Sequence, residues 1–252
     1  MTKPAHAEPP QLCVADQATF WPWFSSPVIG AWPDRERTVV ILPLAGMADW
    51  GLGHPLDAEE TVLTHVIRDA CPLVGKGARP LVAPVLRFSF GADPSCAFPV
   101  DQATAHALIA EVADSVAASG FSRIAIVNSS PWSEELCSAA ARDLRVSRGL
   151  HMFHLHLSAL GLDFHPVRSR SRRRVQTLLT SLYGKEPGAS AAGEREPAWG
   201  DESVGSLGGS HVKLAKARVE GAAILAEAAA HMAKLISDMR DAAPLSAGLT
   251  PT

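Results

Sequence analysis

The residues of this sequence that could do chemistry are mostly histidines and acids. Imidazole and carboxylate groups bind divalent metal ions, and a metal-bound water becomes a nucleophile near neutral pH. One hypothesis is therefore a metal-dependent hydrolase with a centre built from His54, Asp57, Glu59, His154, His156 and His165. Acids at a helix start also offset the partial charge of its N-terminus, so the alternative is an ordinary structural role.

The histidines of the segment LHMFHLHLSAL alternate along one predicted strand. His154 and His156 are two residues apart, so their side chains share one face. Together with His151 or His165 they could offer imidazoles to Zn²⁺, or they could form an ordinary partly buried pair. His165 could also act by itself as an acid or base. The chain has no G-x-S-x-G, P-loop or H-E-x-x-H motif, and no base is indicated for Ser129 and Ser130.

A basic run, VRSRSRRR, supplies Arg168, Arg170, Arg172, Arg173 and Arg174. Guanidinium groups bind carboxylate and phosphate well. A small anionic ligand or an acidic partner near Arg168–Arg174 is therefore one hypothesis, and a solvated basic loop is the other. The run lacks interleaved aromatic residues and the net charge is −3, which argues against nucleic acid as a partner.

Predicted strands and helices alternate along the chain. Apolar runs predict strands over 38–42, 79–86 and 123–128 and in LHMFHLHLSAL, and the run 79–86 should be buried on both faces. Periodicity and start signals predict helices over 57–70, 102–119, 134–144, 173–183 and 211–240, with Gly120 ending the second and Ser133 capping the third. This order predicts an α/β fold of three layers, with helices on both faces of a mostly parallel sheet. The polar candidates follow strand ends, where such folds bind ligands.

One domain is expected over residues 17–241, with a long loop at 184–210. Residues 1–16 and 242–252 are expected to be tails. An aromatic segment near the N-terminus either packs over the domain or forms a subunit contact; it contains Phe20, Trp21, Trp23, Phe24 and Trp32. A small-residue face of the last helix is predicted to pack closely on a neighbour and is a second candidate contact; it comprises Val212, Ala215, Val219, Ala222, Ala226, Ala229, Ala233 and Ile236.

Composition excludes several classes. Of 252 residues 47% are hydrophobic and 19% charged, as in ordinary globular proteins. No apolar run reaches the roughly 18 residues that span a bilayer, and the start lacks a secretory apolar region. Four cysteines lie far apart without a C-x-x-C pair, which suits buried thiols in a reducing compartment. A cytoplasmic protein without a membrane partner is expected.

Several stretches match the motifs of one enzyme family. Residues 38–61, TVVILPLAGMADWGLGHPLDAEET, are similar to P-x-G-S-x-E-Q-H-G-P-H-L-P-L-x-T-D and keep Pro43, Gly46, Gly51, Pro55 and Leu56. GFSRIAIVNSSPWSEEL resembles G-F-x-x-I-x-x-V-N-G-H-G-G-N, LDFHPV resembles D-x-H-A-G, and VQTLLTSLYGKEP resembles E-T-S-x-M-L-A-L-x-P. These are motifs of the creatininase (creatinine amidohydrolase) family. The resemblance implies its α/β fold, oligomeric assembly, and cleavage of a C–N bond in a small amide with one or two divalent metals.

Most of the metal ligands that the resemblance implies are replaced here. The family positions fall at Ala48, Trp50, Glu59, Ser130 and Val175, and only the glutamate is a good ligand. No cofactor is therefore expected; a bound metal, if there is one, would be divalent, such as Zn or Mn. The site is expected to keep His165 as candidate catalytic residue and a ligand pocket made by Trp50, His54, Asp57, Glu59, Asn128, Ser130 and Trp132.

Three functions are compatible with these patterns. The preferred one is a non-catalytic or small-ligand-binding member of the family with a degenerate metal site. The second is an amidohydrolase that cleaves the C–N bond of a small or cyclic amide with a rebuilt centre. The third is an assembly subunit of an active paralogue. A homo-oligomer, or a hetero-oligomer with that paralogue, is expected.

Overall fold

A parallel sheet forms the centre of the computed structural model, which describes residues 14–50, 54–75, 77, 79–90, 96–165, 172–186 and 213–243. Its strands follow the order β2 (Leu81–Val82), β1 (Val39–Ala45), β6 (Arg123–Asn128) and β7 (His151–His156), and β3 (Leu86–Arg87) also pairs with β1. A separate parallel pair joins β4 (Ser89–Phe90) to β5 (Pro99–Val100). Because all pairs are parallel, the carboxyl ends of β1, β6 and β7 meet at one edge.

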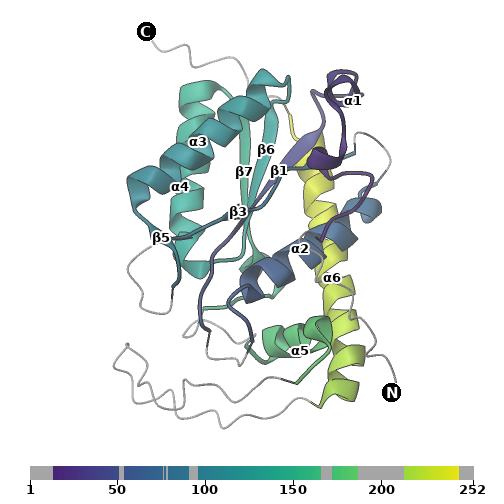
Figure 1. The fold of residues 1–252 in the computed structure, drawn as a ribbon. Helices are drawn as coiled ribbons and strands as arrows, with labels where there is room; N and C mark the ends of the chain where they lie inside the picture. The colour runs from purple at the N-terminus through teal and green to yellow at the C-terminus, as the bar shows by residue number, and fades with distance from the viewer. Residues whose placement is uncertain are drawn as a thin grey trace, which may run out of the picture.

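Helices cover both faces of the sheet, as predicted (Figure 1). One layer contains α3 (Gln102–Ala118) and α4 (Glu134–Arg148), and the other contains α2 (Ala58–Ala70), α5 (Arg172–Tyr183) and α6 (Leu214–Asp241). All seven residues of β1 are buried and alternate between the layers, so Ile41 faces α2 and α6 while Leu42 faces α3 and α4. The three-layer prediction is confirmed.

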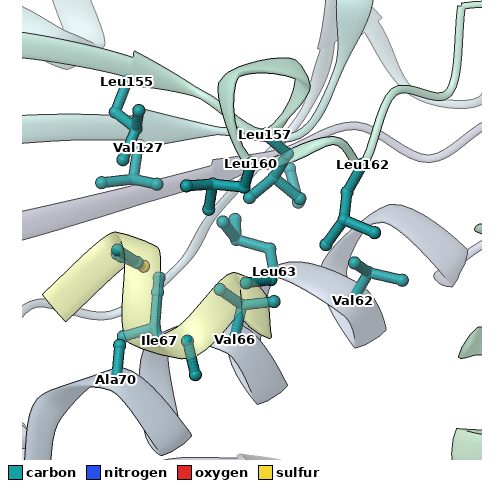
Figure 2. Close-up of a cluster of buried hydrophobic side chains, with 14 of the residues drawn as sticks. Val62, Leu63, Val66, Ile67, Ala70, Val127, Leu155, Leu157, Leu160 and Leu162 are labelled. Atoms are coloured by element: carbon teal, nitrogen blue, oxygen red, sulfur yellow. The ribbon is translucent and has the colours of Figure 1, made fainter. Parts of the chain in front are cut away.

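The core on the α2 side shows how the sheet is covered (Figure 2). Val62, Leu63 and Val66 recur at helical spacing on α2, and each has no exposed surface. They meet Val127 of β6 and a group of leucines that follows β7, which includes Leu157. This packing fixes the first turn of α2 against the carboxyl ends of the strands.

The last helix, α6, packs only in part as predicted: Ala229, Ala233 and Ile236 of the predicted face are buried. The half of α6 nearer its start exposes Ala215, Val219 and Ala222, whereas Ala217 and Gly221 are buried. Alanine-rich helices have several faces of similar polarity, so spacing alone does not identify the packed one. Gly221 permits the close approach of α5, because a Cβ there would lie 2.4 Å from the Cβ of Ser181.

Helix ends follow the sequence signals in part. Gly120 has φ +87°, as predicted, and Asp101 caps α3 by accepting a hydrogen bond from the amide of Thr104. The helix α4 does begin at Glu134. However, the side chain of Ser133 makes no capping bond, because its φ of −96° and ψ of −1° are already helical.

The prediction of one buried strand over 79–86 is wrong. Only β2 and β3 form there, and the exposed Pro84 separates them. Proline cannot donate a ladder hydrogen bond, so the pairing with β1 is interrupted.

The N-terminal aromatic segment packs over the domain. It includes a turn of 3-10 helix, η1 (Trp21–Trp23), and a short helix, α1 (Ser26–Gly30). Phe20 forms a bridge with Val82, and Trp32 is buried in the core on the α3 side, while Trp23 is 51% exposed. Most of the expected tails and of the 184–210 loop lies outside the described residues. Among the described helices none combines the length and the apolar character needed to cross a membrane.

Candidate functional site

Polar residues gather where β1, β6 and β7 end. The register places Leu44, Asn128 and His156 in one row across the three strands. The loop after β1 leads to α2, and the loop after β6 contains Ser129, Ser130 and a turn of 3-10 helix, η3 (Pro131–Ser133). Side chains from these loops therefore meet at the same edge of the sheet.

Glu59 lies at the centre of this edge and has no exposed surface. Its Oε2 accepts a hydrogen bond from the amide of Gly46 at 2.9 Å, and its Oε1 accepts one from the indole Nε1 of Trp50 at 3.0 Å. Burial raises the pKa of this carboxyl to about 7, although the bonds from Gly46 and Trp50 and the hydroxyl of Ser130 oppose the rise. The carboxylate is thus held by the chain itself.

The space around Glu59 is filled. A Cβ on Gly46 would lie 3.0 Å from Oε2 of Glu59 and 3.1 Å from the hydroxyl of Ser130. The hydroxyl of Ser129 also lowers the pKa of Glu59, but its geometry lies outside that of a hydrogen bond. Gly46 therefore permits a close approach of both side chains, and a Cβ at this position would press on them.

Aromatic rings form a wall next to Glu59. The rings of Trp50 and Trp132 stack at 6.1 Å with an interplanar angle of 16°. Phe164 packs on Trp50 at 5.7 Å, and His165 packs on Trp132 at 5.4 Å. Arg172 donates a hydrogen bond to the carbonyl of Trp50 at 3.0 Å, and burial lowers the pKa of its guanidinium. These contacts join the loop after β1, the turn η3 after β6, and the segment that follows β7.

A second chain of hydrogen bonds joins β6 to β7. The amide nitrogen of Asn128 donates to the carbonyl of Ser130 at 2.8 Å, which fixes the orientation of the amide group. Its Oδ1 lies 2.8 Å from Nε2 of His154, and because this oxygen can only accept, Nε2 carries a hydrogen. Burial and the nearby His156 lower the pKa of His154 to about 4. His154 is therefore neutral at pH 7.

His156 is buried on the same face of β7. Its Nδ1 accepts a hydrogen bond from the backbone amide of Ser158 at 3.2 Å and lies 2.8 Å from the hydroxyl of that serine. A carboxylate oxygen of Glu134 lies 3.9 Å away. The prediction that His154 and His156 share one face is correct.

A groove of about 880 Å³ opens beside these residues. Its walls come from η3 and α4, from the end of β7, and from Phe90 and Gln102. Its polar and aromatic lining includes Trp132, Glu134, Glu135, Arg142, His154 and His165. Two carboxylates and one guanidinium thus face an aromatic ring and two imidazoles.

Comparison with known proteins identifies the family. The model of the family described as creatininase, creatinine amidohydrolase, matches residues 24–201. This chain belongs to the creatininase family. No curated protein matches the chain.

Solved creatininases share the fold. One is a creatininase variant in complex with creatine, 17% identical over 89% of this chain and 99% of that chain, with a TM-score of 0.62. Another is a manganese creatininase, 16% identical over 89% and 99%, also with a TM-score of 0.62. A putative creatinine amidohydrolase from Bacteroides fragilis NCTC 9343 is 14% identical over 82% and 92%, with a TM-score of 0.60. At these identities the likeness concerns the fold alone.

The described residues do not fit the metal centre of a creatininase. Both carboxylate oxygens of Glu59 already accept hydrogen bonds from the chain. Ala48 and Val175 are each 1% exposed and belong to the apolar core. Within the described ranges, no three His, Cys, Asp or Glu side chains gather as ligands of one ion.

The candidates for a rebuilt centre are divided between separate places. His54 stacks on Tyr183 at 5.3 Å, and the hydroxyl of Tyr183 donates to Asp57 at 2.5 Å. Burial, and then the charge of Lys185, lower the pKa of His54. His151 lies at the opposite end of β7 from His156, next to Arg123 and Arg145. His54, Asp57 and His151 do not line the groove.

The basic run is only partly described, because residues 168–171 lie outside the described ranges. Arg172 is bonded to Trp50, and Arg174 forms an ion pair with Glu227 at 2.7 Å. Two of the guanidinium groups therefore have partners inside the chain. An anionic ligand near Arg168–Arg174 stays a prediction.

Sequence reasoning brought together part of the site and missed the rest. Trp50, Glu59, Ser130, Trp132 and His165 form one connected set, and their role as a ligand pocket stays a prediction. Gly46, Phe164, Glu134 and Arg142 were not proposed as site residues. The bond between Asn128 and His154 joins the neighbouring strands β6 and β7, and no local sequence pattern predicts it.

Proposed function

We propose that this creatininase-family protein binds a small ligand at the carboxyl end of its sheet and has lost the family's metal centre. The proposal keeps the scaffold of an amidohydrolase but assigns it no hydrolysis. The single observation that carries it is the state of Glu59, the one good ligand left at the family's metal positions.

A metal-binding carboxylate must be ionised and must direct a lone pair at the ion. Glu59 instead directs its oxygens at the amide of Gly46 and the indole of Trp50. Its raised pKa of about 7 means that burial disfavours the ionised form. Moreover, Trp50 and Ser130 stand at the sequence positions where the family resemblance implies imidazole ligands, and the indole of Trp50 is bonded to Glu59. At a pKa of about 7 the carboxyl is about half protonated at pH 7, and both of its oxygens are engaged by the chain, which favours a structural role over metal binding.

The metal content of the purified chain tests this proposal. We expect protein prepared without chelators, and then dialysed against Mn²⁺ or Zn²⁺, to hold far less than one ion per chain by mass spectrometry. We also expect it to leave creatinine unhydrolysed. The matched control is Glu59→Gln, which should give the same metal content. Near-stoichiometric metal that Glu59→Gln abolishes would overturn the proposal.

Assembly and location are further proposals. The 51% exposed Trp23 supports a subunit contact, either with a second copy or with an active paralogue. Burial raises the pKa of the Cys71 and Cys137 thiols to about 12, so both are inert thiols, which suits a reducing cytoplasm.

A further inference from the structure

Basic side chains gather at the amino ends of the central strands, at the opposite end of the sheet from the candidate site. The register places Arg123, the first residue of β6, beside His151, the first residue of β7. Side chains in register on neighbouring strands lie on one face of the sheet, which here is the face covered by α6, because Arg123 donates a hydrogen bond to the carbonyl of Met239. Arg37 precedes β1 by two residues and lies close enough for its charge to act on Arg123.

Arg123 carries a buried charge. The residue is 6% exposed, and its guanidinium donates to the carbonyl of Glu36 at 2.8 Å and to that of Met239 at 3.1 Å. Among the residues that the structure describes, no carboxylate forms an ion pair with this guanidinium. Burial, and then the charge of Arg37, lower its pKa. Buried charges in proteins are normally paired, so Arg123 lacks a partner that such a group usually has.

Asp241 supplies negative charge to this region but divides it between several cations. Its carboxylate lies 2.5 Å from Arg37 and 2.9 Å from Arg240, and its charge also acts on Arg123. Hydrogen bonds from Arg240 and Arg37 lower the pKa of Asp241 to about 2. The side chains of Arg37 and Asp241 are 56% and 47% exposed, and an exposed ion pair of this kind is weak, so a dissolved anion can compete for Arg37.

Arg145 of α4 adds a further positive charge next to His151. It is exposed and donates a hydrogen bond to the carbonyl of Met152 on β7, and no carboxylate in the described part of the chain forms an ion pair with it. Its charge and that of Arg123 act on His151, whose pKa is lowered by burial first and then by both charges. β6 lies between β1 and β7, so Arg37 and Arg145 flank the buried charge of Arg123.

We propose that this amino-end cluster, made of Arg37, Arg123, Arg145 and His151, binds a phosphate group. Guanidinium groups match phosphate oxygens with paired N–H donors. The exposed Arg37 and Arg145 contact the phosphate, the buried Arg123 attracts it through its charge, and Asp241 competes with it for Arg37. The inference goes beyond the proposed function and does not depend on it, because the cluster lies at the other end of the sheet.

Calorimetric titration with inorganic phosphate at constant ionic strength tests the proposal. We expect the intact chain to bind phosphate at least tenfold more tightly than acetate, which has one charge and two oxygens. Glycerol phosphate is the second probe: affinity equal to that of inorganic phosphate identifies a phosphate ester as the ligand, and weaker binding identifies free phosphate, and both results support a phosphate site. No binding of phosphate, or equal affinities for phosphate and acetate, would overturn it.

The variant Arg37→Gln separates the cluster from the general charge of the protein. We expect it to lose about tenfold in phosphate affinity, which corresponds to one hydrogen bond between charged groups. Arg87→Gln is the matched control, because Arg87 also pairs with an acid, Glu60, at 2.7 Å, but at the carboxyl end of β1. It should bind phosphate as the parent does. Equal losses in the two variants would show only a diffuse effect of charge.

Asp241→Asn gives a result that a purely structural network does not predict. Removing the competing carboxylate should raise phosphate affinity about tenfold, even though the loss of two ion pairs lowers the melting temperature. Unchanged or weaker phosphate binding by the folded variant would contradict the assignment. Circular dichroism shows whether each variant is folded, and the comparison of Arg37→Gln with Arg87→Gln decides the question if Asp241→Asn does not fold.

Discussion

Glu59 and His154 are the two side chains at this site whose protonation the fold changes most clearly, and they change in opposite directions. The pKa of Glu59 is raised from 4.5 to about 7, and that of His154 is lowered from 6.5 to about 4, with burial as the largest cause in both cases. Burial penalises whichever form is charged, so both groups favour the neutral state. Glu134 and Glu135 line the groove beside His154.

The raised pKa of Glu59 has a consequence for stability. Below pH 4.5 the carboxyl is protonated in both the folded and the unfolded chain, and its neutral form is fully stabilising. Between about pH 4.5 and 7 the unfolded chain releases the proton first, so Glu59 lowers the free energy of unfolding by up to about 3 kcal/mol as pH rises. His154 acts in the opposite sense, because its stabilising effect is lost as pH falls from 6.5 to about 4. The two effects partly cancel in the intact chain.

Comparison with Glu59→Gln isolates the effect of the carboxyl. We expect the variant to become more stable relative to the parent as pH rises from 4.5 to 7, by about 3 kcal/mol in total. Urea denaturation at a series of pH values measures this difference, and His154 contributes equally to both proteins. A difference that is independent of pH would show that Glu59 has an ordinary carboxyl pKa.

At the scale of elements, the close packing of α5 on α6 depends on Gly221, which has no side chain. A Cβ at position 221 would meet the Cβ of Ser181 at 2.4 Å and the carbonyl oxygen of Thr177 at 3.3 Å. Neither neighbour is the flexible end of a side chain, so the helices would have to move apart. α6 also packs on α2, which carries Glu59, so this contact supports the floor of the site.

We therefore expect Gly221→Ala to destabilise the protein by about 1–3 kcal/mol, the usual cost of an overpacked interface. Alanine is intrinsically better than glycine in a helix by about 1 kcal/mol, so any loss is steric. Thermal and chemical denaturation measure it. The double variant Gly221→Ala with Ser181→Gly should recover stability, and a single variant as stable as the parent would contradict the close contact.

Elements were predictable from the sequence where a local signal defines them. Periodicity located α2, α3 and α5 to within a residue or two, and glycine located the end of α3. Prediction failed where tertiary context decides. Pro84 interrupted a run that reads as one strand, and the packed face of α6 depends on which helix approaches it. The bonds of Trp50 to Glu59 and of Asn128 to His154 join separate loops or strands, so no local pattern encodes them.

At the scale of the whole molecule, the proposed function implies that the scaffold was kept while the chemistry changed. The chain keeps the three layers and the parallel order of a creatininase, whose stability comes from two apolar cores on either side of the sheet. Ala48, Trp50 and Val175 stand at the family's metal positions and belong to one of these cores, so they now add to its apolar burial. A fold of this kind can therefore lose one chemistry and keep a groove for another.

Restoring the ligand types tests whether the scaffold still accepts a metal. The triple variant Ala48→Glu, Trp50→His and Ser130→His replaces three family positions that now carry methyl, indole and hydroxyl groups. Without metal it should be less stable than the parent. It loses the bond from Trp50 to Glu59, and the larger glutamate side chain is crowded at position 48, where Ala48 is 1% exposed. With Mn²⁺ or Zn²⁺ the variant should regain stability in proportion to the logarithm of ion concentration, since only the folded chain assembles the ligands.

The parent should show no such response to metal, which makes it the matched control in a thermal melt. The variant Ala48→Glu is the second control, because a single added carboxylate should not suffice to hold an ion. If the triple variant folds and still ignores both metals, then the loops at the carboxyl end of the sheet have moved beyond ligand distance. If the parent itself melts higher with Mn²⁺ or Zn²⁺, then its own side chains bind the ion, and the loss of the metal centre is disproved.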